Sequence, residues 1–352
     1  MSITLEQILR AGRESGASDV HLVRGVAPAY RVGGDIRIAK AEPLDESILR
    51  QFIAELLSEK HQRILEEQWQ LCFSRQWPGI GRFRASIYFH GGCPEMAIRL
   101  SESVVRSREE LRLPAVVDEL TRKPNGLVLI TGPTGVGKTT TLNYMVNLIN
   151  HERRCKIITI EDPVEFNHDN CKSIVVQQEI FTDTPSFRLA LVHVLRQDPD
   201  VIAIGEMRDL ETTATALTAA ETGHLVMATV HTPDTVQTIQ RIFSIFPPEQ
   251  QNHIMFQLAN SLQGILSQNL LPRADGKGQV LACEVCIPNP AIRHFIREGQ
   301  AHQIISEIQT GRKLQMQTMD SALLELYKRG EITYDVAVSA AHDQRAFQHS
   351  AV

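Results

Sequence analysis

The stretch Gly132-Pro-Thr-Gly-Val-Gly-Lys-Thr139 matches the phosphate-binding pattern G-x-x-x-x-G-K-[ST] at every fixed position. Glycines let the backbone wrap around an anion, so that successive N–H groups and the next helix N-terminus point at phosphate oxygens. Lys138 would reach the terminal phosphates, and the Thr139 hydroxyl would ligate Mg²⁺. The pattern therefore predicts a nucleoside triphosphate site formed by Gly132, Pro133, Thr134, Gly135, Val136, Gly137, Lys138 and Thr139.

The residues on either side of this motif predict the strand and the helix that a phosphate-binding loop connects. The apolar run 126–131 is typical of a buried strand that enters the loop. Residues 140–150 carry apolar side chains at helical spacing, which predicts the helix that leaves the loop. Strands and helices continue to alternate after residue 126, and this alternation is typical of a parallel α/β sheet.

Length and composition set the class of protein. The 352 residues leave room for about two domains, and 43% hydrophobic with 22% charged residues is ordinary for a soluble globular chain. No apolar run approaches the length of a membrane span, and residues 1–20 form an amphipathic pattern with acidic residues, unlike a signal peptide. We therefore expect a cytosolic protein. The net charge of −5 does not favour nucleic acid as a partner.

The six cysteines do not suggest a disulfide framework, because a cytosolic setting keeps thiols reduced. Cys283 and Cys286 have the C-x-x-C spacing of a zinc site. Zinc would need two further ligands, and the sequence has no second C-x-x-C pair. We expect two structural thiols in a strand and no zinc.

The first hundred residues differ in pattern from the remainder. They predict a small α+β domain over 1–100, with a hairpin at 29–38 that turns on Gly33-Gly34 and one long helix over 45–68. Two further strands are expected at 81–89 and 95–100. The polar stretch 101–115 is interpreted as a linker, and 116–352 as the nucleotide-binding domain with a C-terminal helical region.

Carboxylates follow two of the predicted strands of the second domain. The strand 156–160 ends in Glu161-Asp-Pro-Val-Glu165, and the strand 200–205 ends in Glu206. Parallel sheets bind ligands at the carboxyl ends of their strands. One carboxylate of the first group would polarise the attacking water, and Glu206 would hold Mg²⁺, through a water molecule. The alternative for Glu161 and Asp162 is that they only cap a turn before Pro163.

A histidine stands at each end of another predicted strand, which follows Glu221-Thr-Gly-His-Leu225 and ends at His231. A lone histidine is usually structural, whereas His224 and His231 flanking a strand beside the nucleotide edge would be placed to contact phosphate. Both interpretations stay open for His224.

The order of GPTGVGKT, ITIEDPVEF, DPDVIAIGEMRD, AETGHLVMATVHT and AIRHFIREG resembles the PilT-type retraction ATPases of type IV pili, within the wider type II and type IV secretion ATPases. The resemblance covers nearly the whole chain, from ASDVHL near the start to MQTMDSAL near the end. The segment Ala291–Glu298 is similar to the AIRNLIRE motif that marks the PilT branch.

The resemblance implies a PAS-like N-terminal domain, a RecA-like ATPase domain and a cytosolic homo-hexamer. The ring would dock on the inner-membrane platform protein of the pilus and use ATP and Mg²⁺ to withdraw pilin subunits. By position, Glu165 would activate water, Glu206 would be the Walker B carboxylate and metal ligand, and His224 and His231 fall in the histidine box. Arg82 and Arg84 match arginines that approach the nucleotide of a neighbouring subunit. A solvated strand face is the alternative for these two.

The chain also departs from the family pattern. Relatives commonly read QREVGRDT where this chain has Gln177-Gln-Glu-Ile-Phe-Thr-Asp-Thr184, so Gln178 and Thr182 stand in place of two arginines. His294 and Phe295 replace Asn and Leu in the AIRNLIRE motif. These departures leave the predicted hydrolysis residues untouched. Two other classes of function remain: a RecA-like motor that translocates DNA, and a non-hydrolysing accessory partner of pilus retraction.

Overall fold

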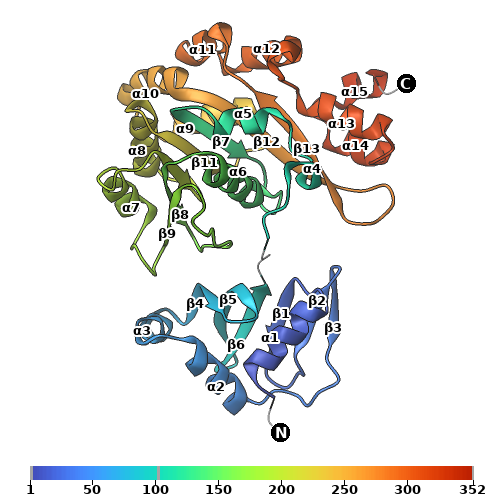
Figure 1. Cartoon of the computed structure of the whole chain (residues 1–352). Helices are drawn as coiled ribbons and strands as arrows, with labels where there is room; N and C mark the ends of the chain where they lie inside the picture. The colour runs from blue at the N-terminus through green and yellow to red at the C-terminus, as the bar shows by residue number, and fades with distance from the viewer. Residues whose placement is uncertain (1–2, 101–103, 351–352) are drawn as a thin grey trace. The chain divides into compact units, whose positions relative to one another are not determined.

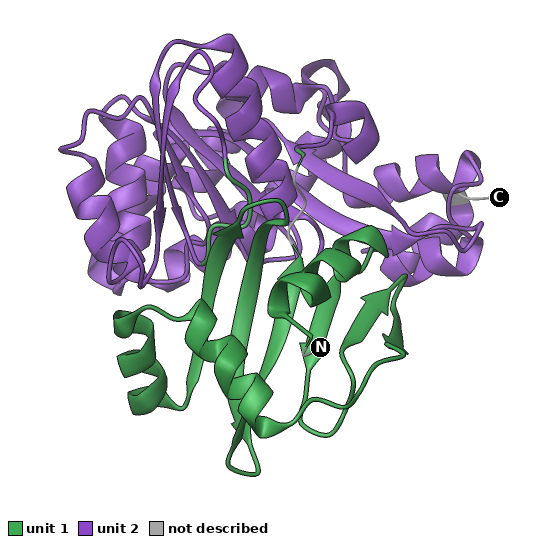
Figure 2. Cartoon of the chain, turned by 60° about the horizontal axis from the view of Figure 1, so that its bottom comes forward, with its two compact units in different colours: residues 1–104, 163–167 green, residues 105–162, 168–352 purple. Residues whose placement is uncertain are grey.

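The computed structural model describes residues 3–100 and 104–350, and its contacts divide the chain into two compact units. Unit 1 comprises Met1–Val104 and Pro163–Asn167, and unit 2 comprises Val105–Asp162 and His168–Val352 (Figure 2). The expected linker 101–115 begins with residues 101–103, which lie outside the described residues. No sequence pattern predicted that the segment 163–167 would join the N-terminal unit.

Unit 1 is built on a six-stranded antiparallel sheet of order β3-β2-β1-β6-β5-β4 (Figure 1). Its elements are α1 (Leu5–Glu14), β1 (Asp19–Leu22), β2 (Ala29–Val32), β3 (Asp35–Ile38), α2 (Glu46–Leu56), α3 (Glu59–Gln68), β4 (Gln70–Trp77), β5 (Gly81–His90) and β6 (Cys93–Leu100). The hairpin of β2 and β3 turns on Gly33 and Gly34, both at positive φ, as predicted.

The prediction of one helix over 45–68 is wrong. Leu57 ends α2 in an extended conformation with ψ of 136°, and the Ser58 side chain accepts a hydrogen bond from the His61 N–H to begin α3. Serine competes with a helix interior because its hydroxyl bonds to nearby backbone groups, and the same property makes it a good N-cap. The helical spacing of apolar residues continues across this break, so the sequence pattern did not indicate two helices.

The sheet of unit 1 has one apolar face and one polar face. In β5, Phe83, Ala85 and Ile87 are buried in the core that α1 and α2 cover, because alternate side chains of a strand point to opposite faces. Arg82 and Arg84 therefore lie on the opposite face, as the sequence predicted.

Unit 2 contains a seven-stranded sheet of order β13-β12-β7-β11-β10-β8-β9, in which only β13 runs antiparallel to its neighbour. The α/β class predicted for this region is confirmed. Its elements are α4 (Arg108–Leu111), α5 (Val116–Thr121), β7 (Gly126–Thr131), α6 (Lys138–Glu152), β8 (Lys156–Glu161), β9 (Ile174–Glu179), α7 (Phe187–Val194), β10 (Val201–Ile204), α8 (Leu210–Glu221), β11 (Leu225–Val230), α9 (Thr235–Ser244), α10 (Pro248–Ser261), β12 (Leu262–Pro272), β13 (Gln279–Cys286), α11 (Pro290–Arg297), η1 (Ala301–Gln303), α12 (Ile304–Thr310), η2 (Arg312–Leu314), α13 (Met319–Lys328), α14 (Tyr334–Ala340) and α15 (Gln344–Ser350).

Helices cover both faces of this sheet, so its strands β7 and β11 are buried along their whole length (Figure 1). Leu127 and Leu129 of β7 join the core that includes α7 to α12, whereas Val128 and Ile130 join the core that includes α5 and α6. The helices α13 to α15 form a smaller core against β12 and β13. Among the described residues no helix combines the length and the apolar character of a membrane span.

Candidate nucleotide site

The phosphate-binding loop leaves the carboxyl end of β7 and leads into α6, as predicted. Gly132 begins the loop with φ of 141°, where a Cβ atom would lie 2.4 Å from the Gln268 carbonyl oxygen of the neighbouring β12. Only glycine fits this position, since both the backbone conformation and the space exclude a side chain. Gly137, with φ of 88°, ends the loop and begins α6 at Lys138.

Lys138 is the first residue of α6, and its side chain folds back onto the loop. Its Nζ atom donates hydrogen bonds of 2.8 Å to the carbonyl oxygens of Gly132 and Pro133. The side chain is buried, and this desolvation lowers the pKa of Lys138, while the charge of Glu206 acts in the opposite direction. The carbonyl oxygens of the loop thus hold the Lys138 ammonium group against the predicted phosphate site.

Glu206 follows β10 at the same edge of the sheet. The preceding Gly205 donates its N–H to the Ile160 carbonyl over 2.7 Å, and a Cβ atom there would lie 3.1 Å from that oxygen. Glycine therefore lets the end of β10 approach β8 closely. Arg208 pairs with the Glu206 carboxylate through its Nε atom.

His231 connects the predicted carboxylate to the predicted cation. Its Nε2 atom lies 3.2 Å from Glu206 Oε1, and its Nδ1 atom lies 3.3 Å from Lys138 Nζ and 3.4 Å from the Thr134 hydroxyl. The structure therefore brings together three residues that are far apart in the sequence. His231 therefore contacts both the phosphate-binding loop and Glu206, so a shift of either one would be felt by the other.

His224 is not part of this cluster. It precedes β11, whose six residues separate it from His231, and a strand of that length spans roughly 20 Å. Its carbonyl oxygen accepts the Gly126 N–H at the start of β7, and its ring contacts the Ala219 carbonyl over 3.0 Å. Within this chain His224 joins α8 to the sheet at the edge opposite the P-loop.

Glu161 and Asp162 differ in their surroundings. Glu161 is buried, and its Oε1 atom accepts hydrogen bonds of 2.6 Å from Thr159 and 3.0 Å from Gln177. Asp162 is exposed at the edge of the sheet. Since Glu161 is engaged by side chains of β8 and β9, it links these two strands rather than capping a turn.

Glu165 belongs to unit 1, whereas the P-loop, Glu206 and His231 belong to unit 2. Arg82 fixes the segment around Glu165 by donating to the Val164 carbonyl and, over 3.0 Å, to the Asn167 side chain. Burial raises the pKa of Glu165, and the positive charges of Arg84 and Arg99 partly oppose this rise. A raised pKa is a common property of carboxylates that accept protons in catalysis.

Arg99 is a residue that sequence reasoning missed. It lies directly across from Arg84 in the antiparallel pair of β6 and β5, and its Nε atom bonds to Asp19 over 2.9 Å. Two like charges in opposite positions repel each other, so the carboxylates of Asp19 and Glu165 stabilise the pair. Residues that lie directly opposite in paired strands share a face of the sheet. Sequence reasoning could have placed Arg99 beside Arg84 only if the register between β5 and β6 had been known.

The helix similar to the AIRNLIRE motif is α11. Ile292 and Ile296 are buried, and Phe295 packs partly against the same core. Arg293 donates to the carbonyl oxygens of Ala259, Asn260 and Leu262, where α10 ends. The arginine of this motif therefore caps a neighbouring helix within the same unit.

Comparisons with known proteins identify the family and the relatives of this chain. Residues 97–351 match the family model described as type II/IV secretion system protein. The chain is 42% identical to the type IV pilus retraction ATPase PilT of Pseudomonas aeruginosa over 96% of its own length and 97% of the relative. It is 37% identical to the type IV pilus ATPase PilU of the same organism, over 96% and 88% of the two chains.

A solved structure covers both units. The crystal structure of the pilus retraction motor PilT with bound ADP matches 99% of this chain and 100% of that one, with a TM-score of 0.93 and 44% identity. A nucleotide site at the P-loop is in accord with this likeness. The chain therefore belongs to the type II/IV secretion system proteins and, within them, to the PilT-type retraction ATPases.

Proposed function

We propose that the protein is a ring-shaped, homo-hexameric motor that hydrolyses ATP to withdraw pilin subunits from a type IV pilus. The observation that carries the enzymatic part is the contact of His231 with both Lys138 and Glu206. A phosphate-binding cation and a metal-orienting carboxylate joined in this way are the parts that P-loop hydrolysis uses. The likeness to PilT supports the pilus part.

The side chains at the site fit Mg²⁺. Thr139 follows Lys138 in the first turn of α6, and Glu206 supplies a carboxylate at the same sheet edge. Hydroxyl and carboxylate oxygens are ligands that Mg²⁺ prefers, usually with waters between. When bound, the ion would neutralise charge that develops on the phosphates. Lys138 and the loop N–H groups would orient those phosphates.

Glu165 is our candidate for the residue that activates water. Its segment is held by Arg82 and its ionisation is favoured by Arg84 and Arg99. We propose that Arg82 and Arg84 also approach the nucleotide of a neighbouring subunit, since guanidinium groups stabilise charge on a transferring phosphoryl group. Hydrolysis would then depend on closure of the ring. Docking on the cytoplasmic side of the inner-membrane platform protein is proposed from the family likeness.

Purified protein assayed for phosphate release tests the enzymatic proposal. We expect turnover that requires Mg²⁺ and is unchanged by added single- or double-stranded DNA. A DNA-translocating motor would instead be stimulated by DNA. An accessory partner would bind ATP without turning it over, and either result would reject the proposal.

The direction of movement needs a cellular test. Deletion of the gene should leave cells with excess pili that do not retract, and expression of the wild-type chain should restore retraction. A deletion strain without pili would show an assembly motor instead. Failure to complement a retraction-deficient strain, despite ATP turnover in vitro, would indicate a divergent paralogue rather than the main retraction motor.

A further inference from the structure

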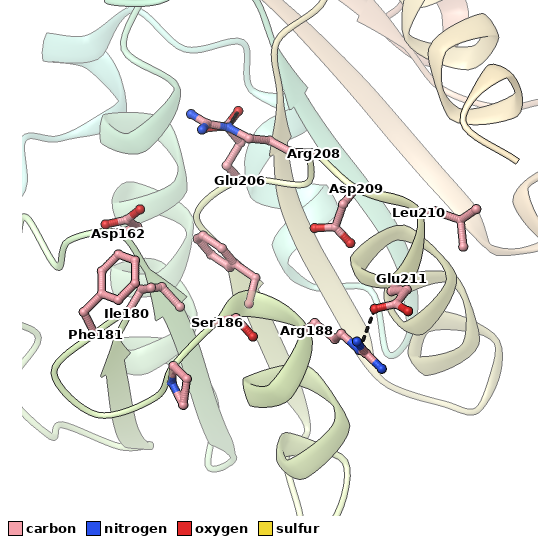
Figure 3. A pocket seen from close by; sticks show the side chains of 12 residues that line it. Asp162, Ile180, Phe181, Ser186, Arg188, Glu206, Arg208, Asp209, Leu210 and Glu211 are labelled. Carbon is pink, nitrogen blue, oxygen red and sulfur yellow. Dashed lines mark hydrogen bonds and ion pairs between the residues drawn. The ribbon is translucent and has the colours of Figure 1, made fainter. Parts of the chain in front are cut away.

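A pocket of about 520 Å³ lies beside Glu206, between the loop that follows β9 and the loop that precedes α8 (Figure 3). Residues of unit 2 form all of its walls. Ile180, Phe187 and Leu210 give it an apolar lining. Among these residues, Glu206 and its partner Arg208 belong to the nucleotide site already described, and Asp162 belongs to the predicted group of carboxylates. The side of the pocket formed by Ile180, Phe181 and residues 185–188 has no assigned role.

Phe181 stands at the rim of this pocket in an unusual conformation. Its φ is 65°, in the left-handed region that a bulky side chain rarely adopts, and 54% of the residue is exposed. An exposed aromatic ring buries little apolar surface on folding, so it contributes little free energy to offset this strain. Strained residues persist where their surroundings force the backbone, and they gather at functional sites.

The loop that carries Phe181 is closed by its own hydrogen bonds. The Phe181 N–H donates to the Thr184 carbonyl over 2.7 Å, and the Asp183 N–H donates to the Glu179 carbonyl over 2.8 Å. Thr182, which occupies one of the positions where relatives have arginine, donates its hydroxyl to Glu179 over 2.9 Å. The ring is therefore presented to solvent by a fixed scaffold rather than by a mobile tip.

The charge of the pocket indicates what it would receive. Its lining carries two guanidinium groups and four carboxylates, namely Arg188, Arg208, Asp162, Glu206, Asp209 and Glu211. Both arginines already pair within the pocket, Arg188 with Glu211 over 2.5 Å and Arg208 with Glu206. The site is thus net acidic and has an aromatic rim. An aromatic face beside carboxylates is suited to an arginine or lysine side chain, through cation–π contact and charge.

Two apolar side chains that are close to the pocket residues in the sequence are exposed, and this indicates a protein partner. Leu189 and Val192, three residues apart on α7, are 42% and 43% exposed. Side chains at this spacing share one face of a helix. A small molecule in the pocket would leave that face uncovered, whereas a folded partner would cover it.

We propose that this pocket receives an arginine or lysine side chain from a second copy of the chain, with Phe181 as the contact that selects it. The inference rests on the proposed ring, which would supply the second copy. Because Glu206 forms one wall, the docked cation would lie beside the metal-orienting carboxylate. Assembly would thereby be sensed at the nucleotide site.

Sedimentation velocity over a concentration series, with Mg²⁺ and a non-hydrolysable ATP analogue, tests this proposal. We expect the wild type to self-associate and Phe181→Gly to weaken association by at least about tenfold, the size of a desolvated cation–π contact. Phe181→Lys should weaken it further because it places a cation at the rim. Phe256→Ala, which removes an aromatic that is 53% exposed on α10, is the matched control and should change association less than about twofold.

The unfolding temperature of dilute protein separates docking from packing. Glycine tolerates positive φ, so Phe181→Gly should keep or raise this temperature while association falls. A lower unfolding temperature with unchanged association would overturn the proposal, as would a wild type that stays monomeric. ATP turnover is measured separately, so that absence of hydrolysis in an associating wild type would reject the proposed function and leave the docking site intact.

Discussion

The two regions that carry the proposed hydrolysis residues are built differently. In unit 2, the P-loop, His231 and Glu206 are joined by contacts of 3.2 to 3.4 Å between loops that leave neighbouring parallel strands. In unit 1, Glu165 lies on a short segment that Arg82 holds by its backbone carbonyl and by Asn167. The first region is fixed by a sheet edge. The second is fixed by arginines on the polar face of another sheet.

This difference separates two tasks. Strand order brings the proposed phosphate and metal ligands together, because parallel strands place their carboxyl ends at one edge. The protonation of Glu165 depends instead on burial and on Arg84 and Arg99. Substitutions in unit 2 should therefore change binding and rate at every pH. Substitutions in the arginine face should change how the rate depends on pH.

Among the substitutions in unit 2, Lys138→Ala should have the largest effect. The cation that reaches the phosphates is lost, and removal of one such electrostatic group typically lowers kcat about 10²–10³-fold. Steady-state phosphate release measures this, with circular dichroism as the control for folding. A rate within a few-fold of the wild type would show that the P-loop cluster is not the site of hydrolysis.

The two histidines offer a sharper comparison within unit 2. His231→Ala removes the contact between Lys138 and Glu206 and should lower kcat by about tenfold, the value of one hydrogen bond to charged groups. His224→Ala acts at the opposite edge of the sheet, so it should lower the unfolding temperature and leave kcat per folded molecule near the wild type. Equal losses of kcat would place both residues at the nucleotide.

Arg99→Gln should move the acidic limb of the pH–rate profile. The proposed base acts when ionised, so activity falls as the pH drops through the pKa of Glu165. Loss of the Arg99 charge raises this pKa further, which shifts the acidic limb to higher pH. Arg37→Gln, an exposed arginine of the edge strand β3, is the control and should leave the profile unchanged. The same profile in both variants would contradict the role of Arg99.

The smallest expected effect concerns stability. Because the pKa of Glu165 is raised on folding, its contribution to stability is present below the unfolded pKa and is lost as the pH rises through the folded pKa. Glu165→Gln should therefore raise the unfolding temperature at pH 8 and change it little at pH 4. Thermal melts at the two pH values measure this. A variant that is less stable at pH 8 would show that the ionised carboxylate supports the fold.

Most of the fold was predictable because its patterns are local. The P-loop, the strand before it and the carboxylate after β10 each follow from a few consecutive residues. The break between α2 and α3 was missed because Leu56, Leu57 and the later apolar residues keep a helical period across Ser58. A single capping hydroxyl decided the boundary there.

The arrangement of the site residues was less predictable because it depends on pairing over long distances. The position of His231 beside Lys138 requires that β11 lies next to β7, which no local pattern gives. Arg99 acquires its role from its register against Arg84, and Phe181 from the closure of its loop. The departures from the family pattern at Gln178 and Thr182 were visible in the sequence, whereas the strain and the exposure of Phe181 between them were not.

The rate of ATP hydrolysis by Glu165→Gln tests the central claim most directly. The change removes the proposed base and preserves the shape of the side chain, so Mg²⁺-dependent turnover should fall about 10²–10⁴-fold while ATP binding remains. Fluorescent nucleotide titration of the same sample confirms the binding. Turnover equal to that of the wild type would contradict the account, because hydrolysis would then proceed without the carboxylate that unit 1 holds.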